Sequence, residues 1–237
     1  MVWVNYIDKI QIKENISDLD DYVKEIPSLK GLLEGDTLPF EKSVTYFVGE
    51  NGSGKSTLIE AIAIAFGMNP EGGGRWHQFE TVNTSSNLHK YLRIIKKYTP
   101  KDTFFLRAES FYNAISNLQL DDVSHHTSHG ESFFDLVEYR FWGNGLYIMD
   151  EPEAALSPQK QLAMLCQIHE LVKKNSQFII ITHSPIMLAY PNATIYNFSK
   201  EGIKEITYEE TDSYKIYKSF MNDSKRMLDL LLNEEQK

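Results

Sequence analysis

Short apolar runs, each bounded by polar residues or glycine, are the strongest pattern along this chain. Three of them span residues 44–48, 146–149 and 177–182. Runs of this length without polar alternation are typical of strands that are buried on both faces. Because helical patterns alternate with them, we expect crossover connections and an α/β fold with a mainly parallel sheet flanked by helices.

Two helices are predicted to pack on this sheet. Residues 56–66 are apolar on nearly every side, and Gly67 follows them as a stop signal. Residues 159–173 follow Ser157 and Pro158, which suit an N-cap and a first-turn proline. One apolar stripe of this second helix should face the core, and it comprises Leu162, Leu165, Ile168 or His169, and Val172.

Weaker patterns surround these elements. Residues 3–12 alternate well enough for an edge strand, whereas residues 28–41 contain glycine and proline and indicate a loop. The segment 214–233 indicates a helix with a break near residues 222–224. Further short strands are expected at residues 91–95, 103–106, 194–198 and 203–208, the last two joined by a tight turn as antiparallel edge strands.

The middle of the chain differs in character. Residues 69–75 have the composition of a flexible hinge, and residues 111–118 and 131–142 indicate helices. We therefore expect a core formed by residues 1–68 and 144–237, with residues 69–143 inserted as a hinge and a small helical subdomain.

The sequence G-E-N-G-S-G-K-S-T fits the phosphate-binding pattern G-x-x-x-x-G-K-[ST] between a predicted strand and a predicted helix. Its glycines allow consecutive backbone N–H groups to face an anion, and the helix N-terminus adds partial positive charge. Lys55 can reach the β- and γ-phosphates, and Ser56 can offer its hydroxyl to Mg²⁺. The predicted nucleotide-binding residues are Gly49, Glu50, Asn51, Gly52, Ser53, Gly54, Lys55, Ser56 and Thr57.

A second motif ends the apolar run at 146–149 with two carboxylates, Asp150 and Glu151. One carboxylate can hold a hydrated metal ion, and the other can take a proton from an attacking water. Together the two motifs predict ATP and Mg²⁺ as ligands and hydrolysis as the reaction.

Composition and charge limit the classes of protein and the cellular compartments that fit this sequence. The 237 residues are 42% hydrophobic, which suffices for one sizeable core, and no apolar run is long enough for a membrane span. The net charge of −9 argues against strong non-specific binding of nucleic acid. The N-terminus lacks the pattern of a secretory signal, and the single cysteine, Cys166, suits a reducing compartment, so we expect a cytoplasmic protein. Cys166 lies among apolar neighbours, and burial is expected.

The order of motifs resembles the ABC-class ATPases, and in particular the soluble SMC/RecF/OLD-like branch and standalone bacterial AAA-family ATPases. The resemblance is carried by the phosphate-binding loop, S-H-G-E-S at 128–132, D-E-P-E-A-A-L-S at 150–157 and T-H-S at 182–184. It implies that Asp150 holds the Mg²⁺ shell, that Glu151 is the general base and that His183 is a switch histidine contacting the γ-phosphate. Ser128 and Gly130, with Glu131, match the signature motif, which caps the nucleotide of a second subunit in a head-to-tail homodimer.

The chain departs from the transporter form of this pattern. The signature lacks a second glycine and a glutamine, and Ser157 stands where transporter-type sequences often carry aspartate. No glutamine marks the Q-loop clearly, so Gln78 and Glu109 are both candidates for a further metal contact. The interval between the first motif and the signature is too short for a long coiled-coil rod.

Three functions stay open at this level. The first is a soluble ATPase that drives a nucleic-acid-maintenance or defence partner. The second is the nucleotide-binding subunit of a membrane transporter, and the third is an ATP-dependent switch for an effector protein. A basic interval could meet DNA or RNA phosphates, although a solvated strand face is the favoured interpretation. Its residues are Lys90, Arg93, Lys96, Lys97, Lys101 and Arg107, and the first four are the candidates for contact with nucleic acid.

Overall fold

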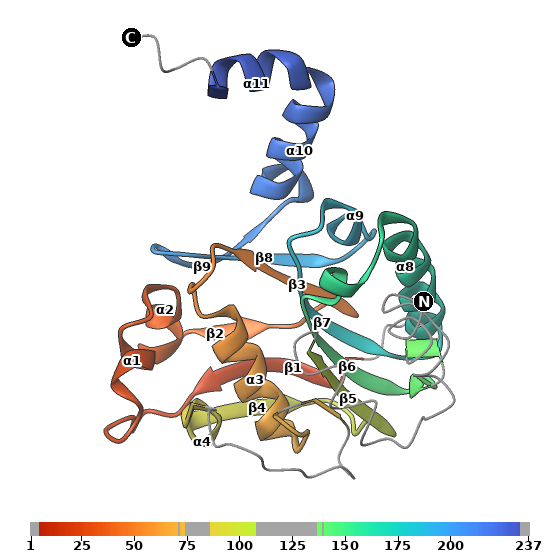
Figure 1. Ribbon diagram of the computed structural model, residues 1–237. Helices are drawn as coiled ribbons and strands as arrows, with labels where there is room; N and C mark the ends of the chain where they lie inside the picture. The colour runs from red at the N-terminus through yellow and green to blue at the C-terminus, as the bar shows by residue number, and fades with distance from the viewer. Residues whose placement is uncertain (1–4, 71, 74–85, 108–136, 139, 233–237) are drawn as a thin grey trace.

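A computed structural model of the chain describes residues 5–70, 72–73, 86–107, 137–138 and 140–232. Its main sheet has six strands in the order β5-β6-β7-β3-β8-β9 (Figure 1). Their bounds are β3 Val44–Gly49, β5 Asp102–Arg107, β6 Gly145–Asp150, β7 Gln177–Ile181, β8 Thr194–Ser199 and β9 Gly202–Ile206.

Strand pairing in this sheet is parallel from β5 to β8, and only the edge strand β9 is antiparallel to its neighbour. The expected mainly parallel sheet with an antiparallel edge is confirmed. Strands β3, β6 and β7 are buried along almost their whole length, as their unbroken apolar sequences predict.

A second sheet has three antiparallel strands in the order β2-β1-β4, formed by Thr37–Pro39, Ile7–Ile12 and Leu92–Lys96. The prediction of an edge strand at 3–12 was wrong, because β1 lies between two partners. The loop predicted at 28–41 was also wrong in part. This segment contains two short helical turns, η1 (Pro27–Leu29) and α2 (Lys30–Leu33), which bury Leu29 and Leu32. The glycines of the segment had favoured a loop over these turns.

Helix α3 (Lys55–Phe66) lies between the two sheets (Figure 1). Its residues Leu58, Ile59 and Ile62 share one buried cluster with Ile10 of β1 and Ile148 of β6. This explains why the helix is apolar on nearly every side. Gly67 closes it with a φ of 89°, as predicted.

Helix α8 (Pro158–Lys173) covers the other face of the main sheet, and Ser157 caps it through a hydrogen bond from the backbone N–H of Lys160 (3.3 Å). The predicted stripe needs a correction, because Leu162 is exposed. The buried side chains are Met164, Ile168, Leu171 and Val172, which are spaced by four, three and one residues along one helical face. Cys166 is exposed as well, so its predicted burial was wrong.

Two strands of the predicted insert, β4 and β5, belong to the two sheets. Most of the remaining residues between 69 and 143 lie outside the described part of the chain, and the division into core and insert stays a prediction. The other short helical turns are α1 Asp21–Lys24, α4 Leu88–Tyr91, η2 Pro152–Ala155, α9 Pro185–Leu188 and η3 Tyr208–Glu210.

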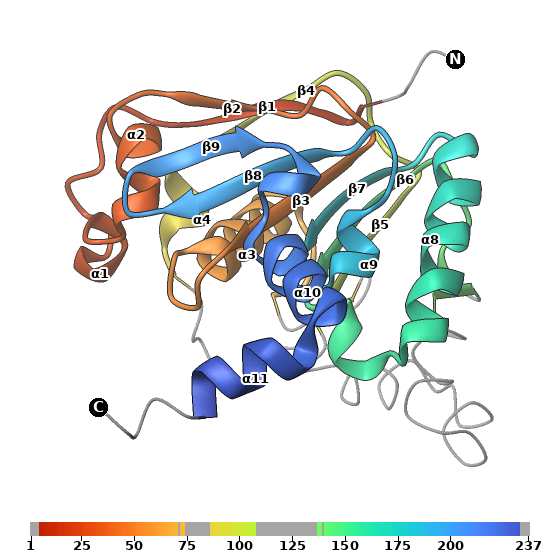
Figure 2. The same cartoon turned by 90° about the horizontal axis from the view of Figure 1, so that it is seen from above.

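The C-terminal segment forms α10 (Asp212–Asn222) and α11 (Ser224–Leu232), separated at Asp223 as the sequence predicts. Both helices stand away from the sheets in Figure 1, and α10 lies beside α9 (Figures 1 and 2). Over the described ranges, every helix is too short or too polar to cross a bilayer.

Candidate functional site

Strands β3, β6 and β7 run parallel and end at the same edge of the main sheet. In parallel sheets, ligands bind in the crevice at the carboxyl ends of strands. The phosphate-binding loop follows β3, Glu151 follows β6, and His183 follows β7. Three of the predicted motifs therefore meet at one edge.

The loop after β3 depends on glycine at two positions where other chain segments come close. Gly49 has a φ of 135°, and a Cβ there would collide with the carbonyl oxygen of Phe198 on β8. Gly54 has a φ of 92°, and a Cβ would lie 2.6 Å from Cγ2 of Ile26. Both the conformation and the space therefore favour glycine over any larger residue at these two positions.

Lys55 is the first residue of α3, and only 4% of its surface is exposed. Its ammonium group donates hydrogen bonds of 2.7 Å to the carbonyl oxygens of both Gly49 and Glu50. Burial lowers the pKa of Lys55, and the nearby carboxylates of Glu151 and Asp150 partly offset this effect. The structure therefore holds a desolvated cation inside the loop, next to two acids.

Ser28 contacts the phosphate-binding loop from a distant segment of the chain, and the sequence analysis did not identify it. Its hydroxyl, on η1, donates a hydrogen bond to the carbonyl oxygen of Ser53. Nothing in the sequence signals this contact, because Ser28 lies in the segment that was interpreted as a loop.

Asp150 and Glu151 occupy different environments although they are adjacent. Asp150 is the last residue of β6, and its side chain is only 12% exposed. Glu151 adopts a left-handed conformation (φ 50°, ψ 53°), while its backbone N–H donates to the carbonyl oxygen of Ile181 (3.0 Å). Such a conformation is strained for glutamate and is often found at functional sites. It turns a half-exposed carboxylate out of the strand while Asp150 stays inside.

His183 lies across from Glu151, with 3.6 Å between its Nε2 atom and Oε1 of the glutamate. This distance is too long for a hydrogen bond. Both side chains are close to half exposed, so their outer parts are accessible to a ligand. The Nε2 atom of His183 is itself buried and has no hydrogen-bond partner among the described residues.

Two sets of contacts tie the segment around His183 to the loop after β6, and no pattern in the sequence indicates either of them. Glu153 Oε1 accepts a hydrogen bond from the backbone N–H of His183 (2.5 Å). Gln161 accepts from the hydroxyl of Ser184 (2.6 Å) and donates from its Nε2 to the carbonyl oxygen of Leu156 (3.0 Å). The two loops at this edge are thereby connected by side chains.

Arg107, at the end of β5, also belongs to this edge, although the sequence placed it in the basic interval. The strand register sets it opposite Asp150. Its Nη1 atom contacts Oε2 of Glu60 on α3 at 3.0 Å, and its Nε atom lies 3.9 Å from Oδ2 of Asp150. Arg107 therefore positions two acids beside the site instead of facing a nucleic acid.

We expect Arg107→Ala to destabilise the fold by roughly 1.5–3 kcal/mol at neutral pH, the range for a lost hydrogen bond to a charged group. Burial already raises the pKa of Glu60, and Arg107 opposes that rise. Without the arginine the folded-state pKa rises further above the unfolded value, so the stability loss should grow as pH rises from 5 to 8. Thermal melts at both pH values test this, with the exposed Arg93→Ala as the control. An equal loss at both pH values would contradict it.

The basic residues of β4 and its neighbours make contacts within the chain. Lys97 forms an ion pair with Asp8 at 2.6 Å, and Lys96 Nζ lies 4.0 Å from the ring centre of Phe66. These contacts support the structural interpretation of the interval. Nucleic-acid binding through Lys90, Arg93, Lys96 and Lys97 stays a prediction.

Several predicted site residues lie outside the described ranges. They are both Q-loop candidates, Gln78 and Glu109, and the signature residues Ser128, Gly130 and Glu131.

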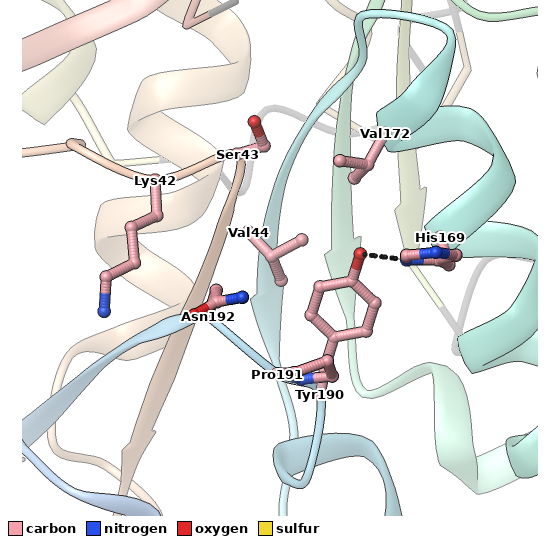
Figure 3. Close-up of a pocket in the computed structure, with 8 residues that line it drawn as sticks. All are labelled: Lys42, Ser43, Val44, His169, Val172, Tyr190, Pro191 and Asn192. Atoms are coloured by element: carbon pink, nitrogen blue, oxygen red, sulfur yellow. Dashed lines mark hydrogen bonds between the residues drawn. The ribbon is translucent and has the colours of Figure 1, made fainter. Parts of the chain in front are cut away.

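Hollows lie at both ends of the main sheet. One of 620 Å³ borders the loop residues 49–53 and extends toward β8, β9 and Ser28. The other, of 320 Å³, lies at the amino ends of the strands between Lys42, Val172 and Tyr190 (Figure 3). In it Tyr190 contacts Nδ1 of His169 at 3.1 Å. Nucleotide sites of parallel sheets form at the carboxyl ends, so the first hollow is relevant to the motifs. A neighbouring hollow of 460 Å³ is relevant as well, because it borders Gly49, Glu50 and Asn51 and also His183.

The residues at the carboxyl edge fit a nucleoside triphosphate with Mg²⁺. At Gly52 of the loop a Cβ would meet no atom within 4 Å, Lys55 supplies a buried cation, and Asp150 supplies a largely buried carboxylate. Together with the topology of the sheet, this site defines an ABC-type P-loop ATPase. A family model for an AAA domain (AAA_23) matches residues 23–237, and the chain belongs to that family.

Curated relatives are ATP-binding proteins of importers. One is a putative ribose/galactose/methyl galactoside import ATP-binding protein of Halalkalibacterium halodurans, 26% identical over 70% of this chain and 37% of its own length. Another is the ribose import ATP-binding protein RbsA of Bacillus cereus, 24% identical over 73% of this chain and 42% of its own length. The chain thus spans less than half of these relatives.

Solved structures with a similar outline include an ATP-binding cassette of an ABC transporter and the SMC head domain from Thermotoga maritima. The first has a TM-score of 0.48 at 17% identity and covers 90% of this chain and 99% of its own. The second has a TM-score of 0.44 at 16% identity and covers 86% and 99%, respectively. Both scores are below 0.5, so the assignment rests on the topology, the site and the family.

Proposed function

We propose that this ATPase binds ATP with Mg²⁺ in the loop of residues 49–57 and uses Glu151 as the general base for hydrolysis. The observation that carries the proposal is the left-handed Glu151, which directs a half-exposed carboxylate to the edge where the buried Lys55 and Asp150 also lie. The further proposal is that two copies of the chain enclose each nucleotide.

Each residue at the edge has a role that its surroundings support. The backbone amides of the loop and Lys55 would hold the phosphates, and Ser56 and Asp150 would hold the metal ion, which neutralises charge on the phosphate oxygens. Glu151 would take a proton from water as the water oxygen bonds to the γ-phosphorus and the bond from that phosphorus to ADP breaks. His183 lies close enough to Glu151 to contact the same phosphate.

The shared site predicts complementation between two inactive variants. Lys55→Ala removes the phosphate-binding lysine, and Ser128→Arg blocks the predicted signature. In a mixed dimer, one of the two composite sites keeps both intact components, so the mixture should regain part of the ATPase activity that each variant lacks alone. Rates of the separate and mixed proteins measure this, and a mixture as inactive as its components would argue against shared sites.

Two observations support different proposals for the cellular role of this ATPase. The motif pattern favours a member of the SMC/RecF/OLD-like branch that drives a nucleic-acid-maintenance or defence partner, or switches an effector protein. The names of the curated relatives favour the nucleotide-binding subunit of an importer, the second candidate. ATPase rates with and without DNA separate the two, because DNA stimulation is expected only for the first.

A further inference from the structure

The C-terminal helices α10 and α11 carry large apolar side chains that the described part of the chain leaves uncovered. On α10 they recur at positions 216, 217, 220 and 221, which lie on one face of a helix. Met221 is 76% exposed and Leu231, on α11, is 65% exposed. We name the C-terminal arm by its exposed apolar residues, which are Ile216, Tyr217, Phe220, Met221, Leu228, Leu230, Leu231 and Leu232.

The arm begins at the rim of the candidate ATP site. Ile216 and Tyr217 line a hollow of 460 Å³ together with Glu50, Asn51 and His183. The apolar surface is therefore continuous with the edge at which a second copy would enclose the nucleotide. Figure 2 shows both helices on the same side of the molecule as the loop that precedes α3.

The size of the arm suits a stable interface. Aromatic side chains have roughly 150–250 Å² of surface and aliphatic ones less, so eight side chains that are more than half exposed on average present on the order of 700 Å². Two such surfaces in a symmetric dimer give on the order of 1,400 Å², within the range of stable protein interfaces. A patch of this size is larger than monomeric proteins usually leave in water.

Charge favours a copy of this chain as the occupant. The arm carries Lys215, Lys218, Lys225 and Arg226 against Asp212, Asp223 and Asp229, a net charge of +1. The whole chain has a net charge of −9, so the remainder is acidic. The net charges of the arm and of the remainder of a second copy are therefore opposite in sign, and twofold symmetry would let each arm meet the other copy in the same way.

We infer that the C-terminal arm docks on a second copy of the chain when ATP is bound and so extends the interface beyond the nucleotide. This inference rests on the proposed ATP-dependent dimer. In that assembly the arm supplies apolar contact area, and the phosphate-binding edge supplies the dependence on nucleotide.

The test uses the full chain with Glu151→Gln as the parent, because this variant should retain ATP. We add Met221→Ser together with Leu231→Ser, and measure dimerisation with ATP and Mg²⁺ by sedimentation and binding of a fluorescent ATP analogue by titration. We expect dimer affinity to fall by roughly 10²-fold, the effect of removing several buried apolar side chains, while the monomer binds the analogue as the parent does. The control is Tyr98→Ser, which alters a residue 58% exposed outside the arm.

The outcomes separate this inference from the proposed function. An arm variant that dimerises like its parent would overturn the inference alone, whereas a parent that binds ATP without dimerising would overturn both. A second measurement does not depend on the serine variants. In a Cys166→Ser background, Met221→Cys labelled with a maleimide that carries a photoreactive group should be cross-linked to the other copy only with ATP present, and nucleotide-independent or absent cross-linking would refute the docking.

Discussion

Glu151→Gln should bind ATP as tightly as the unaltered protein and hydrolyse it about 10²–10⁴ times more slowly, the range for loss of a general base. Glutamine keeps the shape of the side chain but cannot accept a proton from water. The half-exposed position of Glu151 means that the substitution leaves no buried group without a partner, so the melting temperature should hardly change.

Single-turnover rates and titration with a fluorescent ATP analogue measure the two effects separately. The matched control is Glu209→Gln, an exposed glutamate of η3 that should hydrolyse ATP at the original rate. Normal turnover by Glu151→Gln would remove Glu151 from the role of base. Loss of ATP binding without loss of fold would instead make it a binding residue.

Lys55→Ala should weaken ATP binding by about 10²–10⁴-fold. The estimate assumes two charge-assisted hydrogen bonds to phosphate, each worth roughly 1.5–3 kcal/mol, with a tenfold change in affinity for about 1.4 kcal/mol. In the structure its ammonium group already makes two bonds of 2.7 Å to loop carbonyl groups, so the cation is held where phosphates would meet it.

The measurement is calorimetric titration with ATP and Mg²⁺, supported by thermal melts. Lys42→Ala is the control, because Lys42 also donates to a backbone carbonyl group (Ala193, 2.9 Å) but lies at the opposite end of β3 (Figure 3). If both variants bound ATP normally, the assignment of the loop as the phosphate site would be wrong.

Much of the core could be predicted from the sequence because its signals are local. Buried parallel strands are continuous apolar runs, and α3 is apolar on nearly every side because two sheets enclose it. The N-cap Ser157 and the stop Gly67 also act through neighbouring residues. Each of these features depends on residues within a few positions of the element that it forms or ends.

What the sequence could not show depends on contacts between distant segments. Arg107 meets Glu60 through an approach of β5 to α3, and Ser28 meets the loop at Ser53 across 25 positions. Cys166 is exposed because the face of α8 that packs on the sheet contains Met164 and Leu171 and differs from the face that the sequence pattern predicts. Periodicity fixes which residues share a helical face, but the tertiary packing decides which face is covered.

The bonds from Glu153 to the His183 amide and from Gln161 to Ser184 and Leu156 have a mechanical consequence. They make the turns after β6 and β7 a single unit, so a shift of either turn displaces the other without passing through the sheet. A change at the terminal phosphate would then be transmitted sideways along the crevice to the beginning of α8, within one subunit and over a few side chains.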